Sequence, residues 1–260
     1  MRYLRYLQGD RAVWARVEGD FAVELTAAPW KSESQDLRRF QFEPELPLLP
    51  PCEPTKILCV GKNYRGHLRE LHPEEEIPRE PLLFLKPPSA LLPPGGEICL
   101  PPVSERVDYE GELALVIGRK VSRPTLEEAR DAIFGFTVAN DVTARDLQKK
   151  DGQWTRGKGF DTFCPVGPWI KTADPGDVWI TTRVNGEIHQ QARLIQMIFP
   201  PVEIVRYAAG IMTLMPGDLI LTGTPEGVAP LQPGDVVEVE IQGIGVLRNT
   251  VETRVRHDHL

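Results

Sequence analysis

The sequence is poor in the residues that build covalent or zinc-bound frameworks. It has four cysteines, and none of Cys52, Cys59, Cys99 and Cys164 lies in a C-x-x-C pair or beside a histidine at metal-ligand spacing. This arrangement argues against a zinc site and gives no sign of a disulfide framework. Because reduced cysteines are typical of the cytoplasm, we expect the protein there.

A basic surface and long apolar runs are also missing. The net charge is −7, and the 30 basic residues are scattered along the chain, so the sequence lacks the electrostatic signature of nucleic-acid-binding proteins. No segment approaches the roughly 18 apolar residues of a membrane span, and the first residues lack the apolar stretch of a secretion signal. We therefore expect neither nucleic acid nor a membrane as a partner.

The residues that are present predict a folded, strand-rich protein. Hydrophobic residues make up 41% of the 260 positions, which is enough for a substantial core. Short alternating runs in residues 1–50 predict a small N-terminal β domain that ends in a proline-rich linker. Residues 51–260 predict a larger domain, mainly β (α+β) with a few helices. Within it, the polar, proline-containing segment from His72 to Glu80 predicts a surface loop.

Two glutamates open one predicted strand. Glu110 and Glu112 stand two residues apart in DYEGELALVIG, so their side chains share one face, roughly 7 Å apart along the strand. If buried, the two carboxylates lose hydration and repel each other, a cost that a cation offsets. The alternative is that both face water, as most glutamates do.

A third carboxylate lies at the end of the next predicted strand, where Asp141 closes the apolar run FGFTVAND. Three carboxylates without nearby histidine or cysteine provide only oxygen ligands, which suit Mg²⁺, Mn²⁺ or Ca²⁺. Three monodentate carboxylates leave about three positions of an octahedral ion for water or a chelating substrate. The pattern predicts a catalytic type of metal site formed by Glu110, Glu112 and Asp141.

A histidine and a glutamate stand three residues apart in YRGHLREL, whose apolar spacing predicts a helix. At this spacing Glu70 can hydrogen-bond to the imidazole of His67, fix its tautomer and raise its basicity, as a general base requires. An ordinary surface pair produces the same spacing. The spacing leaves both interpretations open.

Two further motifs carry polar groups. Lys158 lies between Gly157 and Gly159, which permit close approach of the backbone, so its ammonium could offset the carboxylates or bind an anionic substrate, or simply be solvated. Thr224 lies where LTGTP leaves a predicted strand, in a turn whose hydroxyls and amides could bind a carboxylate. A purely structural turn is the alternative for Thr224.

Seven segments occur in an order that resembles the fumarylacetoacetate hydrolase family from Lys56 to about Thr250. They are GKNYRGHLREL, EPLLFLKP, DYEGELALVIGR, GFTVANDVTARDLQ, TRGKGFDTFCPVGP, VNGE and GDLILTGTPEGV. The resemblance implies a mixed β-roll core, a Mg²⁺ or Mn²⁺ cofactor, and substrates that carry a 2-oxo acid or its enol. The N-terminal β domain also resembles that of members of the 2-hydroxyhepta-2,4-diene-1,7-dioate isomerase and 5-carboxymethyl-2-oxo-hex-3-ene-1,7-dioate decarboxylase type.

The resemblance assigns roles to nine residues of this chain. The implied metal ligands are Glu110, Glu112 and Asp141, the implied catalytic residues are His67, Glu70 and Lys158, and the implied substrate-binding residues are Arg145, Gln148 and Thr224.

These roles imply a mechanism in which a metal chelates the C1 carboxylate and C2 oxygen of a small 2-oxo acid and stabilises an enolate. Proton movement alone gives isomerisation, loss of a carboxylate gives decarboxylation, and attack by water activated by His67 and Glu70 gives C–C hydrolysis. The charge of Arg145, Lys158 and Arg156 exceeds what one carboxylate uses, which favours a dicarboxylic substrate.

We therefore expect a 2-hydroxyhepta-2,4-diene-1,7-dioate isomerase or decarboxylase of homoprotocatechuate catabolism, acting as a homodimer. The alternatives are an acylpyruvate hydrolase of the fumarylpyruvate type and an oxaloacetate decarboxylase. A catalytically silent metal-binding β protein would keep the fold, but the full set of candidate residues argues against it. A purely structural β protein would not need three inward carboxylates.

Overall fold

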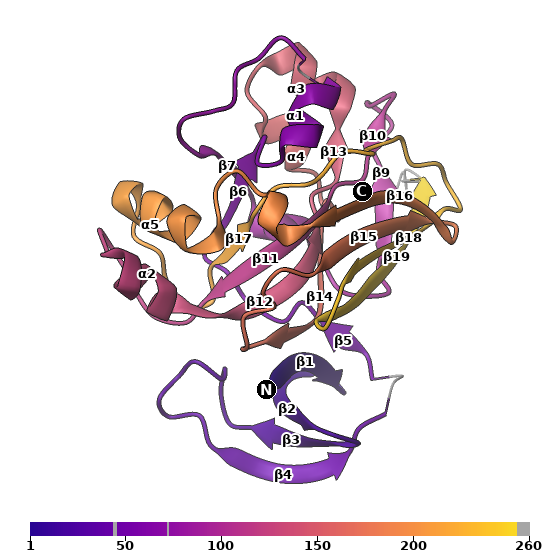
Figure 1. The fold of residues 1–260 in the computed structure, drawn as a ribbon. Coiled ribbons are helices and arrows are strands. Elements are labelled where there is room, and N and C mark those ends of the chain that lie inside the picture. Colours follow the sequence, from indigo (N-terminus) through magenta and orange to yellow (C-terminus); the bar gives the residue numbers. More distant parts are fainter. Residues whose placement is uncertain (44–45, 72, 254–260) are drawn as a thin grey trace, which may run out of the picture.

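The protein is a strand-rich molecule, described here by a computed structural model that covers residues 1–43, 46–71 and 73–253. Strands outnumber the five α-helices of these residues, which confirms the mainly β (α+β) prediction. Figure 1 shows two packed sheets in the larger body, with the N-terminal strands curled beneath them.

The larger sheet has twelve strands, which come from both the N-terminal strands and the larger body. Its order across the sheet is β4 (Asp36–Gln41), β3 (Phe21–Leu25), β2 (Arg11–Glu18), β1 (Arg2–Gln8), β14 (Cys164–Lys171), β12 (Ile133–Asn140), β11 (Gly111–Ile117), β17 (Leu219–Leu221), β6 (Ile57–Gly61) and β7 (Leu82–Lys86). Two short strands lie off this path: β5 (Leu48–Leu49) pairs with β1, and β8 (Leu91–Leu92) pairs with β14. The sheet is mixed, because β17 runs parallel to β6 and β14 parallel to β8.

A second sheet of five strands packs on the first. Its order is β16 (Glu187–Arg193), β15 (Trp179–Val184), β18 (Val236–Ile241), β19 (Gly245–Thr253) and β9 (Glu97–Leu100). A separate pair is formed by β10 (Val107–Asp108) and β13 (Thr143–Ala144). The helices are α1 (Arg65–Leu71), α2 (Leu126–Ala132), α3 (Arg145–Asp151), α4 (Thr155–Lys158) and α5 (Pro201–Ile211), with short 3-10 turns η1 (Pro88–Ala90) and η2 (Leu194–Gln196).

Strand β11 lies at the centre and is buried along its full length. Leu113 and Leu115 point into the core between the two sheets, which also contains Val239 of β18. Ala114 and Val116 point to the opposite face, into a second core. Because side chains alternate along a strand, positions 110 and 112 continue the face of Ala114 and Val116.

The helices gather in two places. In both views α1, α3 and α4 cluster at one end of the molecule, next to β6 and β7, while α2 and α5 pack against each other at another edge. Residues 73–80 of the predicted loop contain turns and bends without helix or strand, and His72 lies outside the described residues. None of the helices in the described part of the chain is long and apolar enough to cross a membrane.

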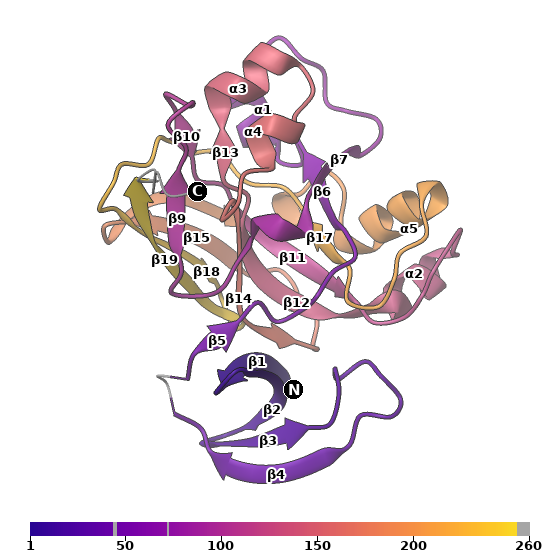
Figure 2. The ribbon, with the colours of Figure 1, turned by 180° about the vertical axis from the view of Figure 1, so that it is seen from behind.

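The N-terminal strands form an antiparallel meander from β1 to β4. Strand β1 joins the meander to the larger body, because Arg2 and Tyr3 pair with Lys171 and Ile170 of β14. The residues on either side of the linker are thereby part of one continuous sheet (Figure 2). The division into domains at residue 50 stays a prediction.

Candidate active site

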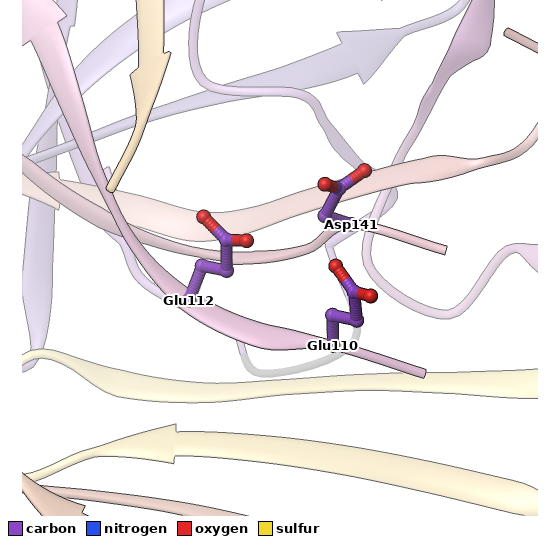
Figure 3. A group of neighbouring side chains, drawn as sticks. All are labelled: Glu110, Glu112 and Asp141. Atoms are coloured by element: carbon purple, nitrogen blue, oxygen red, sulfur yellow. The ribbon is translucent and has the colours of Figure 1, made fainter. Parts of the chain in front are cut away.

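Strand register brings the three predicted metal ligands together. Strands β11 and β12 pair so that Gly111 lies opposite Asn140, and the Asp141 amide donates to the Glu110 carbonyl at 2.8 Å. Asp141 therefore lies across from Glu110, and Glu112 follows on the same face. Oxygen atoms of the three carboxylates lie within 4.8 Å of one another, and Figure 3 shows the side chains converging.

All three carboxylates are buried. The exposed fractions are 4% for Glu110, 2% for Glu112 and 1% for Asp141, so the interpretation that the glutamates face water is wrong. Burying an ionised carboxylate is costly unless cations or hydrogen bonds compensate it. The surroundings of each carboxylate therefore decide what the site can hold.

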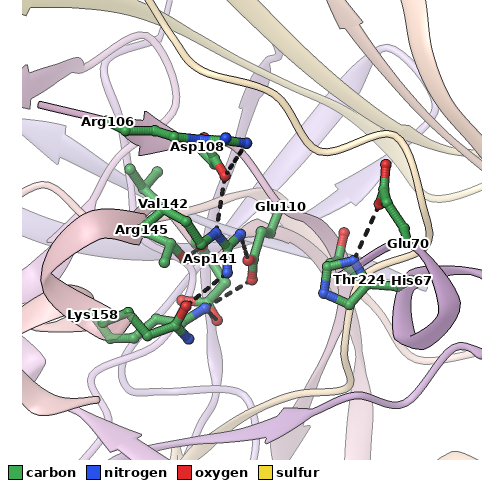
Figure 4. A network of polar contacts seen from close by, with 12 residues as sticks. His67, Glu70, Arg106, Asp108, Glu110, Asp141, Val142, Arg145, Lys158 and Thr224 are labelled. Atoms are coloured by element: carbon green, nitrogen blue, oxygen red, sulfur yellow. Dashed lines mark hydrogen bonds and ion pairs between the residues drawn. The ribbon is translucent and has the colours of Figure 1, made fainter. Parts of the chain in front are cut away.

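Lys158 compensates two of them. It ends the short helix α4, not a solvated loop, and its buried ammonium donates to Glu110 at 2.8 Å and to Asp141 at 2.6 Å (Figure 4). Burial alone would lower the pKa of Lys158, but Asp141 and Glu110 outweigh burial and raise it. Gly157 permits this placement, because a Cβ there would lie 2.9 Å from the backbone of Gln148.

Lys86 also compensates Asp141, and the sequence reasoning missed it. Its ammonium, at the end of β7, donates to an Asp141 carboxylate oxygen at 2.6 Å and to the Val142 carbonyl at 3.1 Å. The side chain is fully buried. A lysine at the end of the apolar run LLFLK was the available signal, since a cation there must find a buried partner.

Arg145 links Glu110 to a fourth buried acid. Its guanidinium donates to Asp108 at 2.9 Å, to the Gln148 side chain at 2.8 Å, and to Glu110. These contacts occupy the fork that the sequence reasoning reserved for substrate. Arg156 pairs instead with Asp151 and does not line the cavity of the site, so counting it among the substrate-binding charges was wrong.

The pKa values of Glu110, just before β11, and Glu112, within it, shift in opposite directions. Burial opposes ionisation of Glu110, but Lys158 and Arg145 outweigh it and lower its pKa. Glu112 accepts a hydrogen bond from the Gly223 amide at 2.6 Å and has no cationic partner in the described part of the chain. Burial, Asp141 and Glu110 raise the pKa of Glu112 well above its usual value. Lys158 opposes this rise without reversing it, so among the described residues Glu112 is the one carboxylate of the three without a cation in direct contact.

His67 and Glu70 both lie on helix α1, as predicted. Their closest nitrogen and oxygen atoms are 3.7 Å apart, which is longer than a hydrogen bond. His67 is buried, and its Nδ1 has no hydrogen-bond partner among the described residues. Contact with His67 and hydrogen bonds from the Gly227 amide, at 3.1 Å, lower the pKa of Glu70 despite partial burial. Glu70 is therefore an ionised carboxylate next to the His67 imidazole.

Thr224 follows β17 and is buried next to β11. Its hydroxyl donates to the Gly111 carbonyl at 2.9 Å and accepts from Gln190 at 2.8 Å. Gly223 before it has a φ of 98°, and a Cβ there would lie 2.7 Å from the side chain of Asn63. The turn therefore requires glycine at position 223 and fixes the Thr224 hydroxyl.

Eight of the nine predicted site residues line one cavity of about 220 Å³. They are His67, Glu110, Glu112, Asp141, Arg145, Gln148, Lys158 and Thr224. Glu70 alone among the nine does not line it. The cavity also has an apolar part, formed by Val60, Leu71, Phe84 and Trp154. It therefore combines an acidic floor with an apolar wall, as small-molecule sites commonly do.

The residues present fit a divalent cation. The donor set contains oxygen alone, which favours a hard ion. Each carboxylate oxygen has two lone pairs, so the lysine contacts leave acceptor capacity for an ion. The observation that points to a cation is that buried Glu112 has no cation in direct contact among the described residues, because burying a carboxylate is costly without such compensation. The three carboxylates can hold a metal ion.

Comparisons with known proteins find matches for both parts of the chain. Residues 56–252 match the family described as fumarylacetoacetate (FAA) hydrolase C-terminal, and residues 1–42 match a family described as Rv2993c-like, N-terminal. The crystal structure of 2-hydroxyhepta-2,4-diene-1,7-dioate isomerase from Mycobacterium marinum is 43% identical, with a TM-score of 0.89, and the match covers 98% of this chain and 100% of that one.

Two further relatives have other activities in their names. The mitochondrial oxaloacetate tautomerase of Bos taurus is 44% identical over 217 residues, which cover 78% of this chain and 68% of that protein. The fumarylpyruvate hydrolase from Pseudomonas aeruginosa, in complex with Mn²⁺ and pyruvate, is 32% identical with a TM-score of 0.73, covering 82% of this chain and 93% of that one. Relatives with these activities support the conclusion that this chain is an enzyme. With its catalytic-domain match and its mixed sheets, the chain belongs to the fumarylacetoacetate hydrolase family.

Proposed function

We propose that this protein is a Mg²⁺- or Mn²⁺-dependent enzyme that moves a proton between the enol and keto forms of dicarboxylic 2-oxo acids. The preferred substrate in this proposal is 2-hydroxyhepta-2,4-diene-1,7-dioate. The observation that carries the proposal is the single cavity in which three buried carboxylates meet His67 and Lys158. The relatives named isomerase and tautomerase support the same reaction class.

Glu110, Glu112 and Asp141 would hold the cation. A bound divalent cation supplies electrostatic stabilisation for the negative charge that develops on the substrate's C2 oxygen. Lys158, which contacts Glu110 and Asp141, keeps the charge of the carboxylates balanced and places a positive group at the cavity surface. These residues therefore bind the 2-oxo acid end of the substrate.

His67 would accept and return the proton. It lines the cavity, and its buried Nδ1 is the ring nitrogen nearer Glu70, which leaves Nε2 as the nitrogen for the substrate. The ionised carboxylate of Glu70, 3.7 Å away, stabilises the imidazolium that forms. The apolar rings of Phe84 and Trp154 line the same cavity and would limit the access of water to the reacting carbons, which suits proton transfer within the substrate.

C–C hydrolysis is a second candidate. It is favoured by the His67–Glu70 pair, which could activate a water, and by the relative named fumarylpyruvate hydrolase. Decarboxylation uses the same stabilised enolate with loss of a carboxylate. The homodimer and the cytoplasmic location remain predictions from the sequence.

Three substrates separate these reactions. We would incubate the protein with Mg²⁺ or Mn²⁺ and with 2-hydroxyhepta-2,4-diene-1,7-dioate, enol-oxaloacetate or fumarylpyruvate, and follow enol absorbance and products. The proposal expects isomerised product from the first at the highest kcat/KM. Release of pyruvate from fumarylpyruvate as the faster reaction would favour hydrolysis. No turnover of any substrate would indicate a silent metal-binding protein.

A variant at position 67 tests the proton transfer. Loss of a general base typically costs about 10²- to 10⁴-fold in rate, so we expect His67→Ala to lower kcat by that factor and to bind metal normally. Arg69→Ala is the matched control, because Arg69 is exposed on the same helix and does not line the cavity. An unchanged kcat in His67→Ala would remove the histidine from the mechanism.

A further inference from the structure

Four cationic side chains line the cavity, and three of them already have acidic partners. Lys158 contacts Glu110 and Asp141, and Arg145 contacts Asp108 and Glu110. Lys62 is paired with Glu75. The fourth, Lys149, has no acidic partner among the residues that the structure describes. Its ammonium is therefore free to bind an anion from outside the protein.

Helix α3 aims Lys149 at the cavity. Arg145, Gln148 and Lys149 stand at positions i, i+3 and i+4 of this helix, so they share one face. Arg145 and Gln148 are buried in the cavity lining, whereas Lys149 is exposed and lies at its solvent side. Lys150, the next residue, is also exposed but does not line the cavity.

An apolar wall completes the cavity lining. The rings of Phe84 and Trp154 meet edge to face with centroids 5.0 Å apart. The ring of Trp154 packs against the backbone of Gly61, where an added Cβ would lie 2.6 Å from the ring. The lining thus provides buried carboxylates for a metal-chelating end, an apolar surface for a carbon chain, and one unpaired ammonium at the solvent side.

We infer that Lys149 binds the second carboxylate of the substrate and determines the preference for dicarboxylic over monocarboxylic 2-oxo acids. This inference rests on the proposed function, since it assumes that the 2-oxo acid end lies at Glu110, Glu112 and Asp141. It replaces the expectation that Arg145, Lys158 and Arg156 supply the charge for this carboxylate. A carboxylate and an ammonium form a charge-assisted hydrogen bond, and no acidic side chain of the described residues is paired with Lys149.

The test compares two ligands that differ only at the distal end. Binding of 2-oxoheptanedioate and of 2-oxoheptanoate, which have the chain length of the proposed substrate, to the Mg²⁺-loaded protein is measured by calorimetry for the wild type, Lys149→Met, Lys149→Arg and the control Lys150→Met. We expect the wild type to prefer the dicarboxylate at least tenfold, which corresponds to about 1.4 kcal/mol. Lys149→Met should lose this preference through weaker dicarboxylate binding alone, while Lys149→Arg and Lys150→Met should keep it.

The outcomes separate this inference from the proposed function. If Lys149→Met weakens both ligands equally, or weakens neither, or if the wild type shows no preference, the inference is overturned. The same variants are then assayed with 2-hydroxyhepta-2,4-diene-1,7-dioate, where Lys149→Met should raise KM and leave kcat within about twofold. A Lys149-dependent preference in binding without any turnover would keep the inference and refute the proposed function.

Discussion

Replacing Lys86 by methionine tests whether the buried charges of the site hold one another in place. The ammonium of Lys86 lies 2.6 Å from Asp141, and both side chains are at most 1% exposed. Removing one partner of a buried ion pair typically costs about 3–5 kcal/mol, because the other charge stays buried without compensation. Asp141 keeps its contact with Lys158, which places the expected loss near the lower limit, at about 3 kcal/mol.

The assay is urea unfolding of the metal-free protein. For an m value of about 3 kcal/mol/M, a loss of about 3 kcal/mol moves the midpoint down by about 1 M. Methionine retains most of the apolar part of the Lys86 side chain, so the midpoint shift reports mainly the loss of the ammonium charge. Lys120→Met is the control, since Lys120 is exposed and such surface changes usually stay within about 0.5 kcal/mol.

A double variant separates charge from packing. Adding Asp141→Asn to Lys86→Met removes the uncompensated carboxylate and should recover part of the lost stability, whereas lost packing would not be recovered. A midpoint shift in Lys86→Met no larger than that of Lys120→Met would refute the reasoning, because Lys158 alone would then suffice for Asp141.

Three other predictions follow from the same contacts. Glu112→Gln should weaken Mg²⁺ or Mn²⁺ binding at least tenfold in a calorimetric titration, and equal affinities would exclude Glu112 as a ligand. Burial raises the pKa of the Cys164 thiol to about 12, and Cys99 is the one partly exposed cysteine of the four, so iodoacetamide at pH 8 should label Cys99 alone until the protein is unfolded. Burial opposes ionisation of Asp146, but hydrogen bonds from the Ser104 hydroxyl and from backbone amides outweigh burial and lower the pKa of Asp146 below its usual 3.8. The variant Asp146→Asn should therefore be less stable than the wild type at pH 7. The difference in stability should disappear as the pH falls below 3.8 and the wild-type carboxylate becomes protonated.

Local pattern was sufficient to predict much of the site. Alternation along one strand placed Glu110 and Glu112 on the same face, and helical spacing placed His67 and Glu70 on one helix. The family resemblance supplied the positions of Lys158, Arg145 and Thr224, which local pattern alone left ambiguous. All of these except Glu70 line the cavity that the structure shows.

Contacts between distant segments were not predictable in the same way. Asp141 meets Glu110 because β11 and β12 adopt one particular register, and Lys86 reaches Asp141 from a strand 55 residues earlier. Whether the glutamates are buried depends on the packing of both sheets around β11, which a local pattern does not contain. The acidic partners of Arg145 were missed for the same reason, since Asp108 and Glu110 lie more than 30 residues before it.

The sheet pairings also determine the order in which this chain can fold as it is synthesised. Strands β11 and β12 are neighbours in the sequence, so the three carboxylates can come together early. Strand β6 must wait for β17, and β1 must wait for β14, which follows it by more than 150 residues. Until β17 emerges from the ribosome, the edge of β11 that pairs with it lacks its partner strand and Thr224 is absent. Because such long-range pairings slow folding, the half-formed sheet stays exposed to chaperones and to aggregation until β14 and β17 have been synthesised.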